Sequence, residues 1–182
     1  MNIKVFNKLK NNISLQLCIC LVTLVIDLIV TVTNSWSVRE FNTLNDPGDT
    51  KERTVGLFIK CTIYVSNKKE CESYTDTSDW LRCCRAMSII SCLLQFSAVI
   101  LTLAIMLKHT KRFDLLSTAC FCSGVCMLIT ITVFAAMNQG TKHNFYKYSW
   151  SFIVSIIATL FSAVCGIYAI TMMRMSESQP KE

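Results

Sequence analysis

The chain has 182 residues, of which 52% are hydrophobic and 16% charged, and its formal net charge is +6. This composition is too apolar for a soluble globular domain of the same length. It therefore excludes the ordinary soluble classes and points to a protein that lies largely in a membrane.

Four long apolar segments divide the chain. Each is about 20 residues or longer, which is the length that a helix needs to cross the hydrocarbon core of a bilayer. Lysines precede the first segment, as in a signal peptide, but the segment is longer than a typical apolar signal region and lacks a clean cleavage site. We therefore predict an all-α membrane protein with four transmembrane helices at residues 13–34, 86–107, 115–137 and 150–173.

Basic residues predict the orientation, because Lys and Arg in short segments stay in the cytoplasm. They gather before the first helix and between the second and third: Lys4, Lys8, Lys10, Lys108, Lys111 and Arg112. We expect both chain ends in the cytoplasm and the protein in the plasma membrane. The expected segments are a first outer loop (35–85), a second outer loop (138–149) and cytoplasmic segments 1–12, 108–114 and 174–182.

The charges of the first loop cancel, since it holds eight basic and eight acidic residues. The net charge of the chain therefore comes from other segments. We interpret it as a sign of topology and of contact with anionic lipid. Nucleic-acid binding is not expected.

Asp27 places a carboxylate inside the first predicted helix. An ionised carboxylate in hydrocarbon is costly unless it is paired or protonated. It could belong to an ion or proton pathway, or it could be a buried hydrogen-bond anchor. We favour the anchor, because the predicted helices hold no second charge. The polar residues expected at the same depth are Ser91, Gln95, Thr130 and Ser155.

Seven of the eleven cysteines fall inside predicted helices, where cysteine usually packs as a small apolar residue. These are Cys18, Cys20, Cys92, Cys120, Cys122, Cys126 and Cys165. Cys122 and Cys126 have a spacing that would suit a metal, yet no His or carboxylate nearby completes a site. We predict no metal and no other cofactor.

The other four cysteines belong to the first loop, with Cys61 and Cys71 well inside it and Cys83 and Cys84 at its end. Four cysteines allow three pairings, of which we prefer Cys61 with Cys71. Residues 54–65 are rich in β-branched and aromatic side chains, and a turn sequence follows. The pattern predicts a β-hairpin closed by a disulfide. A solvated loop with two free thiols is the alternative.

Small side chains recur every four residues on two predicted helices, which favours close helix packing in a membrane. The fourth helix has Ala158, Ser162 and Gly166, and the third has Thr118, Cys122, Cys126 and Thr130.

Aromatic residues lie where helices are expected to meet the membrane surface, a position that suits an interfacial belt. They are Trp36, Tyr146, Tyr148 and Trp150. A ligand-binding aromatic cage is the alternative for them. His109 and His143 fall on opposite sides of the membrane, and no phosphate-binding loop is present, so we do not expect an enzyme.

Several of these residues occur in an order that resembles a known signature. Trp36 is followed by Gly56-Leu57-Phe58, by Cys61 and Cys71, and then by Arg85 at the start of the second helix. This order is similar to the W, GLW, C and C signature of the claudin superfamily, which includes peripheral myelin protein and the epithelial membrane proteins. The segment 148–152 looks more like the branch with lens fibre membrane intrinsic protein than like tight-junction claudins.

The resemblance implies a left-handed four-helix bundle capped by an extracellular antiparallel β-sheet. Most of this sheet would come from the first loop, with a contribution from the second, and Cys61 with Cys71 would form its disulfide. The sequence departs from the signature at Phe58, where the family has tryptophan, and in the extra pair Cys83 and Cys84. The segment 179–182 lacks the terminal hydrophobic residue with which claudins engage PDZ scaffolds, so no such partner is expected.

The expected function is that of a non-enzymatic protein in cell–cell contact or membrane organisation. Its outer sheet would bind another copy or other membrane proteins, in cis or in trans. One alternative is an auxiliary subunit that modulates a channel or receptor. Another is a component of a paracellular ion pathway, although the balanced charge of the first loop gives no reason to expect ion selectivity.

Overall fold

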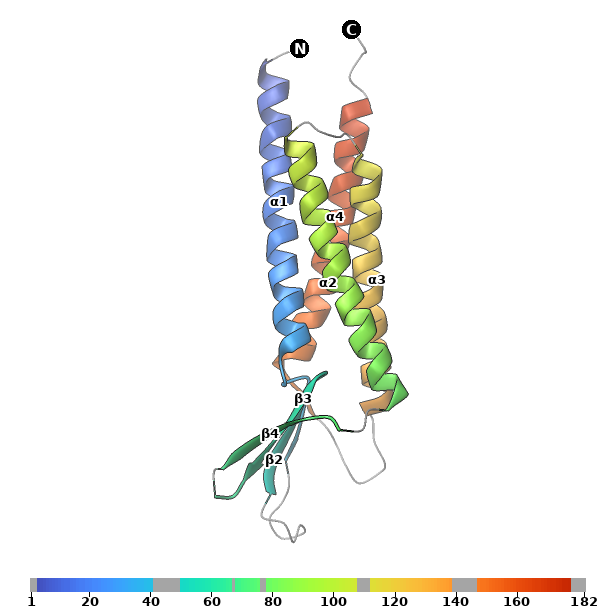
Figure 1. The fold of residues 1–182 in the computed structure, drawn as a ribbon. Coiled ribbons are helices and arrows are strands. Elements are labelled where there is room, and N and C mark those ends of the chain that lie inside the picture. Colours follow the sequence, from blue (N-terminus) through green and yellow to red (C-terminus); the bar gives the residue numbers. More distant parts are fainter. Residues whose placement is uncertain are drawn as a thin grey trace.

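The computed structural model describes residues 3–40, 50–66, 68–75, 78–107, 112–138 and 147–177. Predictions for Lys108, His109, Lys111, His143, Tyr146 and residues 179–182 lie outside these ranges. Four helices run side by side (Figure 1): α1 (Ile3–Val32), α2 (Asp79–Met106), α3 (Phe113–Asn138) and α4 (Trp150–Glu177). Each contains a segment long and apolar enough to cross a membrane, which in α1 is Asn11–Val32. The predicted four-helix architecture is confirmed.

The outside of the bundle is apolar, as expected for helices surrounded by lipid, whereas its interior combines apolar clusters with polar side chains. Large apolar side chains such as Leu93 and Leu160 point outward and are each 62% exposed. Hydroxyl and amide side chains lie inside and bond between helices. Ser91, for example, lies 3.0 Å from the hydroxyl of Ser123, and both side chains are fully buried. Because lipid gives helices no hydrophobic reason to associate, such contacts and close packing hold the bundle together.

The small residues of α4 face the bundle interior. Ala158, Ser162 and Gly166 are all buried. At Gly166 the approach of α3 is close, because a Cβ atom there would lie 2.7 Å from the ring of Phe121. The hydroxyl of Ser117 donates to the carbonyl oxygen of Gly166 at 3.2 Å.

The packing face predicted for α3 is wrong. Thr118 and Cys122 are exposed, Cys126 is partly buried, and only Thr130 is buried. A step of four residues advances about 40° further than one full turn, so a long row of such steps moves around the helix. The face that packs instead carries Ser117, Cys120, Ser123, Gly124 and Met127.

A five-stranded antiparallel sheet lies at the end of the bundle opposite the first residues of α1 (Figure 1). Its strands are β1 (Ser37–Glu40), β2 (Thr50–Val55), β3 (Ile59–Tyr64), β4 (Lys69–Ser73) and β5 (Lys147–Tyr148), in the order β4-β3-β2-β1-β5. The first four strands come from the segment between α1 and α2. The fifth comes from the segment between α3 and α4, so both segments contribute to one sheet, as predicted.

Candidate functional site

Trp36 joins the sheet to the helices. Its side chain is fully buried, and its indole nitrogen donates to the carbonyl oxygen of Val30 at 2.8 Å. Its ring centroid lies 5.0 Å from that of Phe134 on α3 and 6.2 Å from that of Phe152 on α4. The prediction that Trp36 belongs to an interfacial belt is therefore wrong. Trp150, by contrast, is 50% exposed at the start of α4, which suits such a belt.

The backbone of Trp36 links two further elements. Its amide donates to the carbonyl oxygen of Val55 in β2 at 3.0 Å, and its carbonyl oxygen accepts from the amide of Ser149 at 3.1 Å. Ser149 directly precedes α4. One residue thus ties together the end of α1, the sheet and the beginning of α4, and it fixes where the sheet stands on the bundle.

The turn between β2 and β3 packs against the end of α1. A Cβ atom at Gly56 would overlap the backbone of Asn34 and would lie 2.6 Å from the carbonyl oxygen of Thr33. Real side chains do not fit at such distances, so the position requires glycine. Leu57 follows and is fully buried in the same aromatic cluster as Trp36. The glycine and leucine of the signature therefore have packing roles.

Arg85 in α2 and Tyr74, which follows β4, both bond to this turn. Nε of Arg85 donates to the carbonyl oxygen of Leu57 at 2.6 Å. The hydroxyl of Tyr74 donates to the carbonyl oxygen of Gly56 at 3.0 Å. The guanidinium carbon of Arg85 also lies 5.4 Å from the ring centroid of Phe58 and 5.1 Å from that of Tyr74. These distances are within the range of cation–π contact. Phe58 thus lies under Arg85.

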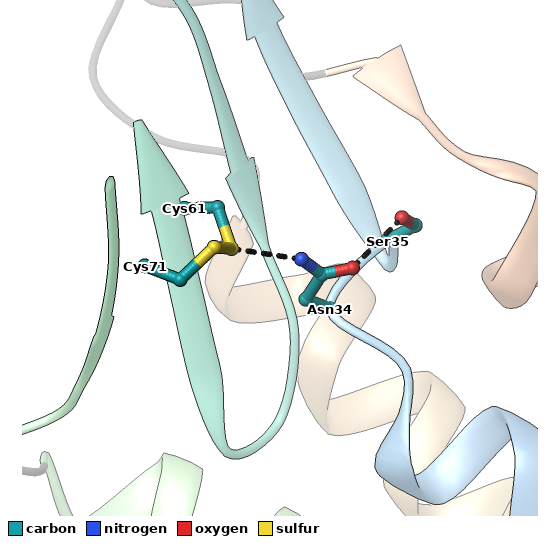
Figure 2. The surroundings of a disulfide bond; sticks show 4 residues. All are labelled: Asn34, Ser35, Cys61 and Cys71. Atoms are coloured by element: carbon teal, nitrogen blue, oxygen red, sulfur yellow. Dashed lines mark hydrogen bonds between the residues drawn. A yellow bond between two sulfur atoms is a disulfide. The ribbon is translucent and has the colours of Figure 1, made fainter. Parts of the chain in front are cut away.

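The predicted disulfide between Cys61 and Cys71 is present and joins directly opposite residues of β3 and β4 (Figure 2). The side-chain amide of Asn34, just after α1, donates to Sγ of Cys61 at 2.8 Å. Ser35 donates to Oδ1 of Asn34 at 3.3 Å. The disulfide therefore closes the hairpin and also contacts the chain that leaves α1. Cys83 and Cys84 are free thiols, and Cys84 is buried.

The hairpin carries charged pairs on its exposed side. Lys68 lies 2.7 Å from one carboxylate oxygen of Glu70, and the hydroxyl of Tyr64 donates to the other at 3.1 Å. Both hydrogen bonds lower the pKa of Glu70, and the bond from Lys68 has the larger effect. Lys60 and Glu72 form a second pair between β3 and β4, at 3.6 Å. Charged side chains on an edge strand such as β4 discourage unspecific pairing with other strands.

Asp27 is buried in the bundle, with 1% of its surface exposed. Neither of its carboxyl oxygens has a hydrogen-bond partner among the described residues. The polar residues expected at its depth bond elsewhere, Gln95 to the carbonyl oxygen of Cys20 and Thr130 to that of Cys126. The structure therefore shows a buried carboxyl group without the bonds of an anchor, and the role of Asp27 stays a proposal.

Three cysteines that the sequence patterns did not connect meet inside the bundle. Cys20, Cys120 and Cys165 come from α1, α3 and α4, and their sulfur atoms all lie within 4.8 Å of one another. Each side chain is fully buried. Their separations of 45 residues or more follow no local spacing, so only the tertiary packing of the helices brings them together.

Comparison with known proteins identifies the family. No curated protein was found to match the sequence. The model of the PMP-22/EMP/MP20/Claudin family matches residues 13–169, which include the sheet, the disulfide and most of the four helices. The chain therefore belongs to the PMP-22/EMP/MP20/Claudin family and is an integral membrane protein with four membrane-spanning helices.

Proposed function

We propose that the protein acts in cell–cell contact or membrane organisation at the plasma membrane, through its five-stranded sheet. One observation carries this proposal: strands from both connecting segments form a single sheet that Trp36 fixes directly to the helix ends. A sheet held in this way keeps a defined position relative to the bilayer. A partner can therefore meet the same surface on every copy.

The proposal places the sheet outside the cell and both chain ends in the cytoplasm. Disulfides persist in oxidising compartments, and Cys61–Cys71 lies in the sheet. In the sequence, the basic residues Lys108, Lys111 and Arg112 fall between α2 and α3. The end of α2 and the start of α3 lie at the end of the bundle away from the sheet (Figure 1). Basic residues in a short segment favour the cytoplasmic side.

The β3–β4 hairpin suits a polar contact that includes an exposed apolar side chain. The exposed strand β4 carries Glu70 and Glu72, which pair with lysines of the same hairpin. Val65, in the turn between β3 and β4, is apolar and 47% exposed. Interfaces between proteins commonly combine an apolar centre with a polar rim. We propose that the partner is another copy or a different membrane protein that covers Val65 and meets the surrounding charges.

Expression of the tagged protein in cells that otherwise adhere weakly tests the proposal. It predicts that expressing cells cluster and that the protein gathers where cells touch. Co-purification with one larger membrane protein, without gathering at contacts, would favour the auxiliary subunit instead. A change in the conductance of an epithelial layer without clustering would favour the ion pathway. Surface labelling of the intact cells in the same experiment controls for the amount of protein delivered.

A further inference from the structure

We propose that Cys20, Cys120 and Cys165 form a binding site for one soft divalent metal ion, Zn²⁺ in the cell, between α1, α3 and α4. The three sulfur atoms lie within 4.8 Å of one another, and those of Cys20 and Cys165 are 3.5 Å apart. α1 and α3 lie diagonally across the bundle, each packing against α2 and α4. The cluster therefore sits where three helices converge.

The spacing of the sulfur atoms suits coordination. With a Zn–S bond of about 2.3 Å, the sulfurs of a tetrahedral site lie about 3.8 Å apart. The Cys20–Cys165 separation of 3.5 Å is close to that value, and no pair of the three sulfurs is more than 4.8 Å apart. Small rotations of the cysteine side chains would therefore bring all three sulfurs into bonding distance of one ion.

Gln16 offers a fourth ligand. Its side chain is 2% exposed, and its amide nitrogen lies 3.6 Å from Sγ of Cys20 and donates to the carbonyl oxygen of Cys165 at 3.1 Å. The amide oxygen has no hydrogen-bond partner among the described residues. Rotation about the last side-chain bond exchanges the two amide atoms and brings the oxygen toward the sulfurs, and it breaks the hydrogen bond to the carbonyl oxygen of Cys165. A buried polar oxygen without a partner is costly, and a metal ion would satisfy it.

A small cavity lies next to the cluster. It has a volume of about 10 Å³, is lined by Gln16, Thr102, Phe113 and Met172 among others, and lies toward the end of the bundle away from the sheet. This is about the space that one water molecule needs. Gln16 lines this cavity and also contacts Cys20, so it lies between the cavity and the sulfurs.

The softness of the ligands selects the ion. Cysteines bind a metal as thiolates, so binding would release their protons to the solvent. Ca²⁺ and Mg²⁺ prefer oxygen ligands. Thiolate ligands favour Zn²⁺ and its spectroscopic substitute Cd²⁺.

Titration of the purified full-length protein with Cd²⁺, in detergent and under reducing, oxygen-free conditions, tests the site. The proposal predicts ultraviolet charge-transfer absorption that saturates at one ion per chain and that Zn²⁺ abolishes by competition. Cys20→Ser, Cys120→Ser and Cys165→Ser should each reduce this absorption by more than half. Cys18→Ser and Cys122→Ser are matched controls, because these exposed cysteines lie on α1 and α3. They should bind as the wild type does.

Cadmium NMR of the wild-type protein needs no variant, since the chemical shift reports how many sulfurs bind the ion. A shift typical of three sulfurs supports the site even if the serine variants fail to fold. The proposal is overturned if no saturable absorption appears, or if Cys120→Ser leaves it unchanged. A disulfide between Cys20 and Cys165 in protein alkylated directly in cells would also overturn it.

Discussion

Nε of Arg85 donates a hydrogen bond of 2.6 Å to the carbonyl oxygen of Leu57, and this bond joins α2 to the turn between β2 and β3. Both residues belong to the order of residues that resembles the claudin signature, although 28 positions separate them. The same turn is held by Tyr74 and packs against the end of α1 at Gly56. Arg85, Leu57 and Gly56 therefore belong to one structural unit that helps to place the sheet on the helices.

Replacement of Arg85 by alanine should destabilise this junction. The variant loses a hydrogen bond from a charged donor and the contact with the rings of Phe58 and Tyr74. The expected loss in the free energy of unfolding is about 1.5–3 kcal/mol. Arg85→Lys should recover only part of it, because an ammonium group does not stack as a guanidinium does. Thermal unfolding in detergent measures both. Arg82→Ala, on the exposed side of the same turn of α2, should cost far less; equal losses would contradict this role for Arg85.

Loss of the disulfide should lower delivery to the cell surface. Cys61→Ser and Cys71→Ser each open a loop whose closure stabilises the fold by about 2–4 kcal/mol. The double variant should be no worse than either single one, because all three lack the same bond. Surface biotinylation measures delivery, with Cys18→Ser as control. Mass spectrometry of unreduced peptides should show the Cys61–Cys71 link, and a link from Cys61 to Cys83 or Cys84 would contradict it.

The close approach of α3 and α4 should appear as coupling between Gly166 and Phe121. Gly166→Ala places a Cβ atom 2.7 Å from the Phe121 ring, so the ring must move, and because it is 37% exposed we expect a loss of only about 1 kcal/mol. In a Phe121→Ala background the same change should cost much less. At Gly124 the nearest atom to an added Cβ is 3.4 Å away, which makes Gly124→Ala a matched control that should be tolerated. Additive losses in the double variant would refute the contact.

Asp27→Asn should fold and reach the surface nearly as the wild type does. The side chain keeps its size, and a neutral amide avoids the cost of a charge in an interior where the carboxyl group has no described partner. Thermal unfolding and surface labelling test this. Loss of an ion-dependent activity in a variant that folds normally would favour the ion pathway over a structural role.

The sequence predicted the helices and the hairpin, because these depend on the residues within each segment and not on contacts between distant segments. The length of the apolar segments indicated four helices, and the β-branched residues before Cys61 with the turn after them indicated the hairpin. The prediction for Trp36 was wrong, because a tryptophan near a helix end can face lipid or turn inward, and Trp36 turns inward against Phe134 and Phe152. That choice depends on packing with α3 and α4.

The buried face of α3 and the meeting of Cys20, Cys120 and Cys165 also escaped the sequence patterns. Regular spacing on one helix shows which residues share a side, but not which side the neighbouring helices cover. Thr118 and Cys122 share spacing with Thr130, yet they point outward. Cysteines on three separate helices meet only because the helices converge at one depth.

The ratio of protein density at cell–cell contacts to that on free membrane tests the central claim most directly. It should be measured by imaging living cells that carry equal surface amounts of the wild type, Val65→Lys and Val65→Thr. A contact made through the sheet predicts a ratio well above one for the wild type and for Val65→Thr. Val65→Lys should lower it, because a charge then replaces an exposed apolar side chain in the β3–β4 turn. A ratio of one for the wild type would contradict the account.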